Sequence, residues 1–309
     1  KWKQGLAEAN AREQSELAES KERISLENTS KESISLDELQ PSINTLKNWG
    51  LKIRLGCNIF NSSNQFAGND IERAFDLQEM IDNNDIKAIL FARGGYGSVR
   101  IVDRINFSNL IYNPKWLIGY SDITVFHSHL NTLGIASIHG TMPVNFKNNT
   151  SKAILSLHNR LFFSSNKIEF NDSNIDLNFS VTGEIIGGNL SILYSLIGSS
   201  SDLNTDNKIL FLEDLDEYLY HIDRMMISLK RSGKLSNLKA LIIGSMTKMN
   251  DNIIPFGKTA NEIILEHTNS YNYPVISNFP AGHINNNLSI ILGKESHLKI
   301  DNNNVTLLQ

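Results

Sequence analysis

Hydrophobic and polar positions along the chain repeat with periods that predict helices and strands in turn. Leu39, Ile43 and Leu46 recur at helical spacing, and this first helix is predicted to end at Gly50 as its C-cap. A short strand is predicted over residues 51–56. From Ser35 onward the pattern therefore indicates regular secondary structure.

A second helix is predicted over residues 69–81. Asn69 stands at its N-cap and Glu72 follows three residues later, which is the pattern of a capping box. The residues expected on its buried stripe are Ile71, Ala74, Leu77 and Ile81.

Continuous apolar runs follow at residues 86–92, 115–120 and 134–140, with a helical stretch over 122–133 between the last two. Such runs are typical of strands buried on both faces of a parallel sheet. Strands that alternate with helices indicate an α/β fold. We therefore expect residues 35–150 to form an N-terminal domain with a mostly parallel sheet flanked by helices.

The rest of the chain predicts a smaller C-terminal α/β domain over residues 183–309, after a polar, Asn- and Ser-rich linker over 151–182. Its tail from residue 274 reads as short strands with Asn/Gly turns, which indicates a mixed or antiparallel layer. Residues 1–34 have few apolar anchors and are expected to form an atypical N-terminal arm. The expected elements are helices over 189–198 and 216–233 and strands over 208–213 and 238–245.

Composition narrows the possible partners. The 309 residues are 40% hydrophobic and 20% charged, as in a globular protein, and a net charge of -4 without a basic run argues against nucleic acid and anionic membranes as partners. The single cysteine, Cys57, excludes an internal disulfide framework, fits a reducing compartment and is expected to be buried or half-buried. No run approaches roughly 18 apolar residues, and the first thirty residues lack a signal-peptide core, so we expect a cytoplasmic location.

A candidate nucleophile lies where the predicted strand 115–120 turns into a helix. Gly119, Tyr120 and Ser121 form the turn, and Asp122 begins the helix, which is the context of a nucleophile elbow. The usual G-x-S-x-G pattern is not met because Ile123 replaces the second glycine. The alternative is that Ser121 only caps the helix.

A serine nucleophile requires a base, and the histidines differ in their suitability. His127 and His129 are two residues apart on one helix, so they do not share a face and suit neither a metal pair nor a base. His139 ends a strand and is expected to be either buried or near the site. His283 lies in a Gly/Pro/Asn-rich loop, where functional residues concentrate, and is the best candidate.

The orienting carboxylate is expected at the carboxyl edge of the second sheet. Glu213 ends the apolar strand 208–213, and ligands of open α/β folds bind at that edge. Asp214, Asp216 and Glu217 are rivals, and each can equally be a solvated or capping acid.

Two adjacent glycines, Gly94 and Gly95, follow the strand 86–92. Their spacing fits neither the dinucleotide fingerprint nor a P-loop. They instead predict a turn at the sheet edge, beside Ser121, whose bare backbone N–H groups reach a developing oxyanion.

These stretches together resemble the LD-carboxypeptidase family of serine peptidases, which includes muramoyltetrapeptide carboxypeptidases and microcin C immunity peptidases. The blocks that carry the resemblance are collinear over roughly residues 36 to 300: ILFARGGYGSVRIVDRINF, NPKWLIGYSDITVFHSHL, IHGTMP, GEIIGGNLSIL, ILFLEDLDEYLYHIDRM and PAGHINNNLSIILG.

The resemblance implies a Ser121, Glu213 and His283 triad, with an oxyanion hole formed by the backbone N–H groups of Asp122 and Gly95. It also implies a site between two domains, no metal or other cofactor, and a homodimer. The expected reaction is hydrolysis of the amide between an L-configured centre and a terminal D-amino acid, with a small murein peptide as substrate in peptidoglycan recycling.

Substrate contacts are less sharply predicted. Arg93 or Arg100 is a candidate for the substrate's terminal carboxylate, and ion pairs are the alternative for both. Gly94 and Asn189 are also candidates, with a helix cap as the alternative for Asn189.

Two other functions stay open. The first is an immunity-type peptidase acting on a peptidyl-nucleotide antibiotic, which is disfavoured because no tryptophan follows Trp116 to stack on a base. The second is a catalytically silent peptide-binding module. The reason to consider this module is the unusual N-terminal sequence. Glu27, Lys31 and Glu32 stand where the family has apolar or small residues in and after its first strand, so either this strand is degenerate or the N-terminus has been replaced.

Overall fold

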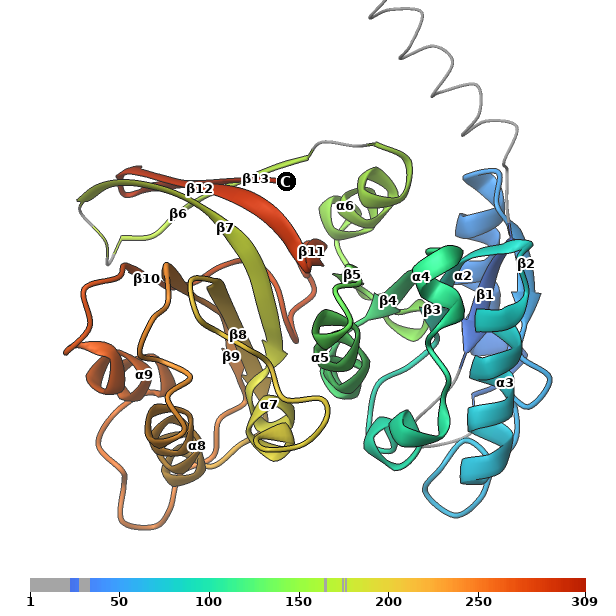
Figure 1. Ribbon diagram of the computed structural model, residues 1–309, viewed down its shortest axis with the longest axis horizontal. Helices are drawn as coiled ribbons and strands as arrows, with labels where there is room; N and C mark the ends of the chain where they lie inside the picture. Colours follow the sequence, from blue (N-terminus) through green and yellow to red (C-terminus); the bar gives the residue numbers. More distant parts are fainter. Residues whose placement is uncertain (1–22, 28–33, 164–165, 174, 176) are drawn as a thin grey trace, which may run out of the picture.

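The computed structural model describes residues 23–27, 34–163, 166–173, 175 and 177–309. These residues form two β-sheets with helices packed on them, which Figure 1 shows as two lobes joined along α5 and β7. The first sheet has the strand order β11-β5-β4-β3-β1-β2, and the second has the order β10-β9-β8-β7-β12-β13-β6. The predicted α/β class with two sheets is confirmed.

The first sheet is parallel except for β11, which pairs antiparallel with β5. Helices α2 and α6 cover one face, and α3 and α5 cover the other. The elements of this half are β1 (Arg23–Glu27), α2 (Leu36–Asn48), β2 (Lys52–Leu55), α3 (Asp70–Asp82), β3 (Ile86–Phe91), α4 (Asn109–Tyr112), β4 (Trp116–Gly119), α5 (Thr124–Thr132), β5 (Ser137–His139) and α6 (Ser151–Phe162).

The second sheet is mixed, as predicted. Strands β7 to β10 are parallel, whereas β12, β13 and β6 are antiparallel. The elements are β6 (Lys167–Asn171), β7 (Leu177–Asn189), α7 (Leu190–Leu196), β8 (Ile209–Leu215), α8 (Leu219–Arg231), β9 (Ala240–Thr247), α9 (Ala260–Thr268), β10 (Val275–Ile276), β11 (Ile290–Leu292), β12 (Lys294–Asn302) and β13 (Asn304–Leu308).

The family's first strand is present despite its unusual sequence. β1 lies between β2 and β3 and pairs parallel with both. Ile24 and Leu26 are fully buried on it, so two apolar side chains are enough to place this strand in the core. The remaining residues of the predicted N-terminal arm, 1–22 and 28–33, lie outside the described part, whereas Ile34 is buried.

The stretch predicted as a linker, 151–182, contains α6, β6 and the start of β7. In α6, Ala153 and Leu157 are buried together with the polar Ser156 and Arg160, whereas Leu155 is exposed, so burial does not follow the apolar positions of the sequence. In addition, β11 from the predicted C-terminal domain completes the N-terminal sheet. The chain therefore crosses between the two sheets three times, before β6, before β11 and before β12.

The buried stripe of α3 differs from the prediction at its start. Leu77 and Ile81 are buried as expected, but Ile71 is 73% exposed. The first turn instead buries Arg73, whose Nη1 donates to the carbonyl oxygen of Gly97 at 3.0 Å. This polar side chain faces inward because it supports the loop that follows β3.

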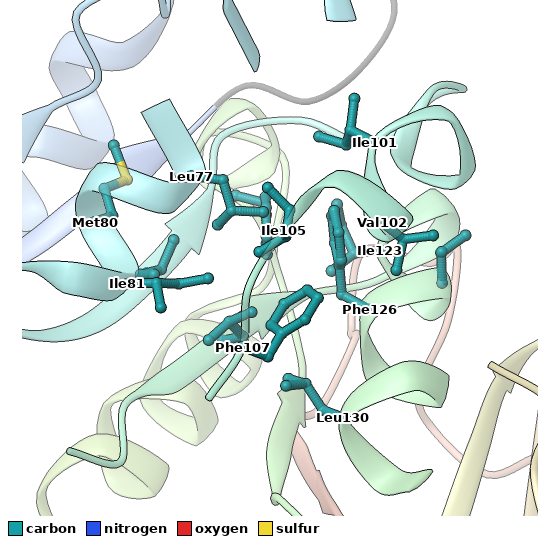
Figure 2. Close-up of a cluster of buried hydrophobic side chains, with 14 of the residues drawn as sticks. Leu77, Met80, Ile81, Ile101, Val102, Ile105, Phe107, Ile123, Phe126 and Leu130 are labelled. Carbon is teal, nitrogen blue, oxygen red and sulfur yellow. The ribbon is translucent and has the colours of Figure 1, made fainter. Parts of the chain in front are cut away.

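One hydrophobic cluster joins α3, the segment after the glycine turn, and α5 (Figure 2). Its side chains include Leu77, Ile101, Phe107, Ile123 and Phe126, all buried. The cluster continues to the sheet, where the ring of Phe126 stacks on that of Phe91 at 5.3 Å between centroids. The glycine turn and the start of α5 are therefore held by the same close-packed core.

Candidate active site

Ser121 lies in a strained turn directly after β4. Its φ angle is +64°, in the left-handed region, where a residue with a side chain costs about 1–2 kcal/mol. Tyr120 before it is extended, and a short 3₁₀ turn over Ser121–Ile123 leads into α5. Ile123 is the N-cap of α5, so the alternative in which Ser121 caps this helix is not what the structure shows. A sharp strand-to-helix turn of this kind presents a serine at the top of a sheet.

Gly94 packs directly against Ser121. A Cβ atom on Gly94 would lie 3.0 Å from Ser121 Cβ and 3.3 Å from Ser121 Oγ. The following turn has Gly95 at φ +136° and Gly97 at φ +144°, conformations that favour glycine. The bare backbone predicted beside the candidate nucleophile is therefore present.

The side chain of Asp122 fastens the glycine turn to the Ser121 turn. Its Oδ2 accepts the backbone N–H of Ser98 at 2.8 Å, and the side chain is 1% exposed. Burial raises the pKa of Asp122, although the Ser98 hydrogen bonds oppose that rise. The two turns thus form one hydrogen-bonded unit.

His283 and Glu213 form a hydrogen-bonded pair in the second sheet's half. His283 Nδ1 lies 2.7 Å from Glu213 Oε2, and Glu213 is completely buried. Burial alone raises the pKa of this carboxyl, but the positive charge on His283 and hydrogen bonding outweigh it and bring the pKa to about 2. The pKa of His283 is raised: burial acts against this rise, but the Glu213 charge exceeds its effect. Glu213 therefore stays ionised and orients the imidazole.

Gly282 lets the histidine loop approach this carboxylate. Its φ is +113°, and a Cβ there would lie 2.8 Å from Glu213 Oε2. Its backbone N–H donates to Asn287 Oδ1 at 2.8 Å, which fixes the loop. Sequence reasoning did not single out Gly282, although its place immediately before His283 was a signal.

The two halves of the site meet through Tyr120 and α5. The Tyr120 ring lies 4.8 Å from the His283 ring between centroids, which brings the histidine beside the Ser121 turn. Thr124 Oγ1 in the first turn of α5 accepts the backbone N–H of Asn189 at 3.0 Å. The structure thus brings the buried acid and the oriented imidazole of one half close to the elbow serine of the other, beside the bare backbone of the glycine turn.

Comparison with known proteins decides the family. Residues 24–140 match the model of the LD-carboxypeptidase N-terminal domain, and residues 182–298 match that of the LD-carboxypeptidase C-terminal domain. The chain belongs to the LD-carboxypeptidase family. It is accordingly a serine-type carboxypeptidase, a hydrolase, as predicted.

Individual relatives agree with this assignment. The probable murein peptide carboxypeptidase of Bacillus subtilis is 31% identical, over 84% of this chain and 83% of its own length. The crystal structure of muramoyltetrapeptide carboxypeptidase from Oxalobacter formigenes matches with a TM-score of 0.85 and 25% identity, over 93% of this chain and 98% of that one. The microcin C7 self-immunity protein MccF has a TM-score of 0.83 at 21% identity, over 94% and 96% of the two chains, which shows a shared fold.

In this member of the LD-carboxypeptidase family, the three other acids considered for the role of Glu213 have other partners. Asp214 accepts Asn189 Nδ2 at 2.8 Å and the Ser191 N–H at 2.9 Å. Burial and the neighbouring Glu213 charge raise the pKa of Asp214 to about 7. Asp216 accepts from the Asn250 side chain, and Glu217 pairs with His221 at 2.5 Å. Of these four acids, Glu213 alone has a hydrogen bond to His283 among the described contacts.

The predicted substrate contacts divide into two groups. Asn189 is the N-cap of α7, where its Oδ1 accepts the Ile192 N–H, so the helix-cap alternative describes it. Arg100 forms an ion pair with Asp70 at 2.7 Å, which is the structural alternative considered for it. Arg93 also forms an ion pair, with Glu38 at 3.8 Å, but it sits next to Gly94, and its side chain is 25% exposed.

The other histidines have structural roles or lie deeper. His127 is buried between Ser137 Oγ and the carbonyl oxygen of Gly119, and burial lowers its pKa to about 3. His129 lies 3.0 Å from Ser201 Oγ. The interpretation of this pair as unsuited to act as the base is consistent with these contacts. His139 is completely buried near Glu213.

Cys57 does not match its prediction, because it is exposed in the turn after β2. Within the described ranges, no helix is long and apolar enough to cross a membrane. The same part of the chain holds no group of three or more His, Cys, Asp or Glu side chains placed to bind a metal ion.

Proposed function

We propose that the chain is a murein tetrapeptide carboxypeptidase, with Ser121, His283 and Glu213 as its triad. The observation that carries this proposal is the His283 to Glu213 hydrogen bond beside the strained Ser121 turn. The substrate class is supported by the similarity to the murein peptide carboxypeptidase of Bacillus subtilis and the muramoyltetrapeptide carboxypeptidase of Oxalobacter formigenes. The product is the tripeptide and a free D-amino acid.

In this mechanism Ser121 Oγ attacks the carbonyl carbon of the terminal amide while His283 Nε2 takes its proton. Glu213 holds the Nδ1–H and stabilises the imidazolium that forms. The tetrahedral oxyanion accepts hydrogen bonds from the backbone N–H groups of Asp122 and Gly95. His283 then gives its proton to the leaving amine, and water hydrolyses the acyl-enzyme by the same steps in reverse.

Specificity for a terminal residue requires a group that meets the free carboxylate. Arg93 is suited to this because it adjoins Gly94 and remains partly exposed, and a guanidinium binds a carboxylate through two parallel hydrogen bonds. Gly94 leaves room for the substrate beside Ser121. The proposal extends to a homodimer in the cytoplasm, which sedimentation and cell fractionation would test.

Incubation with murein tetrapeptide, followed by mass spectrometry, tests the function. We expect loss of one D-alanine, no reaction with the peptide that ends in L-alanine, and no product from Ser121→Ala. Tight binding without product would instead support the peptide-binding module. Cleavage of a peptidyl-nucleotide but not of tetrapeptide would support the immunity-type peptidase.

A further inference from the structure

A second histidine, His139, points at the candidate triad carboxylate from the opposite side. It is the last residue of β5 in the first sheet, whereas Glu213 belongs to β8 in the second. His139 Nε2 lies 4.0 Å from Glu213 Oε1, the oxygen that His283 does not use. Glu213 is thus flanked by one histidine on each oxygen.

The polar atoms on this side are buried and have no hydrogen-bond partner in the described part of the chain. They are Glu213 Oε1 and both ring nitrogens of His139, in side chains that are 0% exposed. Buried polar atoms are rarely left unpaired, because each then loses its hydration without compensation. The arrangement that satisfies two of them at once is an Nε2–H donated by His139 to Glu213.

The observed separation is about 1 Å longer than a hydrogen bond between charged groups. Aromatic rings hold the imidazole facing this way, with Phe211 edge-on at 5.0 Å and Tyr120 at 5.8 Å between centroids. A small approach of the two sheets is therefore enough to form the bond.

We propose that His139 is a positioning residue that donates Nε2–H to Glu213 Oε1 and so divides the carboxylate's charge between two histidines. This inference rests on the proposed function of Glu213 and His283. His139 pairs with Gly119 in β4, two residues before Ser121. Through this strand, the half that carries the serine also sets the position of the acid in the other half.

The donated bond has a consequence for His283. Without it, the whole carboxylate charge acts on the His283 proton, which raises the pKa of His283. Since the base must be neutral, the acidic limb of kcat/KM then moves to higher pH. The titratable groups that face this cluster are Tyr120 from the β4 end, His127 from α5, Asp214 from β8 and His283 from its loop. All four are present in wild type and variants alike, so they do not account for a difference between them.

Three variants separate donation from packing. Gln places an amide N–H near the Nε2 position, Phe fills the space without a donor, and Asn is polar but too short to reach Glu213. For His139→Phe we expect kcat/KM at pH 7 to fall on the order of 10- to 100-fold. We also expect the acidic limb to rise by about half to one pH unit, which is less than the full effect of one hydrogen bond to a charged group, because the lost bond is made to Glu213 and not to His283 itself. His139→Gln is expected to stay within several-fold of wild type.

The pKa of His283 is also measured directly, by NMR titration of its ring in the substrate-free protein. This keeps the inference separate from the proposed function, because the shift is expected even if tetrapeptide proves not to be the substrate. If His139→Phe does not fold, His139→Asn takes its place. The inference is overturned if His283 keeps its wild-type pKa in the Phe variant, or in the Asn variant that replaces it, or if that variant behaves like the Gln variant.

Discussion

Asp122 accepts the backbone N–H of Ser98 at 2.8 Å across the first sheet's carboxyl edge. One residue thus offers its backbone N–H at the helix start as a proposed oxyanion donor, while its side chain fixes the glycine turn that carries the second proposed donor. The relative position of two backbone amides therefore depends on one buried side chain.

Removal of this side chain is expected to separate the two turns. For Asp122→Ala we expect turnover to fall on the order of 10- to 100-fold, because the Gly95 amide loses its position. Loss of the hydrogen bond from the Ser98 N–H to Asp122 is expected to cost about 1–3 kcal/mol in the free energy of unfolding. Asp122→Asn retains an acceptor oxygen and is expected to recover most of both. Steady-state kinetics and urea unfolding measure the two effects; equal losses in Ala and Asn would contradict the role as acceptor.

Gly94 and Gly134 form a matched pair for testing the approach to Ser121. A Cβ on Gly94 would lie 3.0 Å from Ser121 Cβ, so Gly94→Ala is expected to lower turnover by about 100-fold or more. Gly134 has φ +72°, and a Cβ on it would meet no atom within 4 Å, so Gly134→Ala is expected to cost about 1 kcal/mol of stability with normal turnover. Normal turnover in Gly94→Ala would show that the nucleophile is not crowded at this point.

The repeating apolar pattern was sufficient to predict the strands around Ser121. β3 and β4 are short and mostly apolar, and β5, although two of its three residues are polar, lies within the predicted run 134–140. α6 was missed because its buried side includes the polar residues Ser156 and Arg160, while the apolar Leu155 is exposed. The sequence predicted that Ile71 is buried in the first turn of α3, but Arg73 is buried there instead. This was missed because the partner of Arg73, the Gly97 carbonyl oxygen, belongs to a loop distant in sequence.

The site shows the same division. The turn geometry at Ser121 follows from neighbouring residues and was recognised as an elbow. The Glu213 and His283 pair joins residues 70 positions apart, and the spacing of the sequence alone left four acids open. The contact between His139 and Glu213 depends on how the two sheets pack, which no local pattern records.

Asp214 gives a pH dependence of stability with a defined sign. Its pKa is about 7 in the folded protein against 3.8 as its ordinary value, so the folded state holds the proton more tightly. The stability contributed by this group is therefore present at low pH and is lost as pH rises from about 4 to 7. The loss is on the order of 4 kcal/mol.

Asp214→Asn is expected to remove this part of the slope. The amide offers one acceptor oxygen where the carboxylate serves Asn189, Ser191 and Leu215, so we expect a further pH-independent cost of about 1–3 kcal/mol. Urea unfolding at pH 4.5, 6 and 7.5 separates the two effects. An unchanged slope in the variant would mean that Asp214 is ionised at neutral pH without cost.

Arg93 and Arg100 flank the glycine turn and differ in their partners. Arg93→Gln is expected to raise KM by about tenfold or more with a smaller change in kcat, because it is proposed to bind the terminal carboxylate in both ground and transition states. Arg100→Gln is the control: it removes the ion pair with Asp70, a solvent-screened contact that contributes little to stability. If only Arg100→Gln raises KM, then Arg100, and not Arg93, binds the terminal carboxylate.

The triad assignment predicts non-additive losses. If His283 acts only by taking the proton of Ser121 Oγ, then neither residue retains its contribution once the other is gone. Ser121→Ala and His283→Ala are each expected to lower turnover by roughly 10⁴- to 10⁶-fold, and the double variant to fall no more than several-fold further. Single-turnover assays with tetrapeptide measure all three, with circular dichroism as the check on folding. Losses that multiply in the double variant would mean that the two side chains act in separate steps.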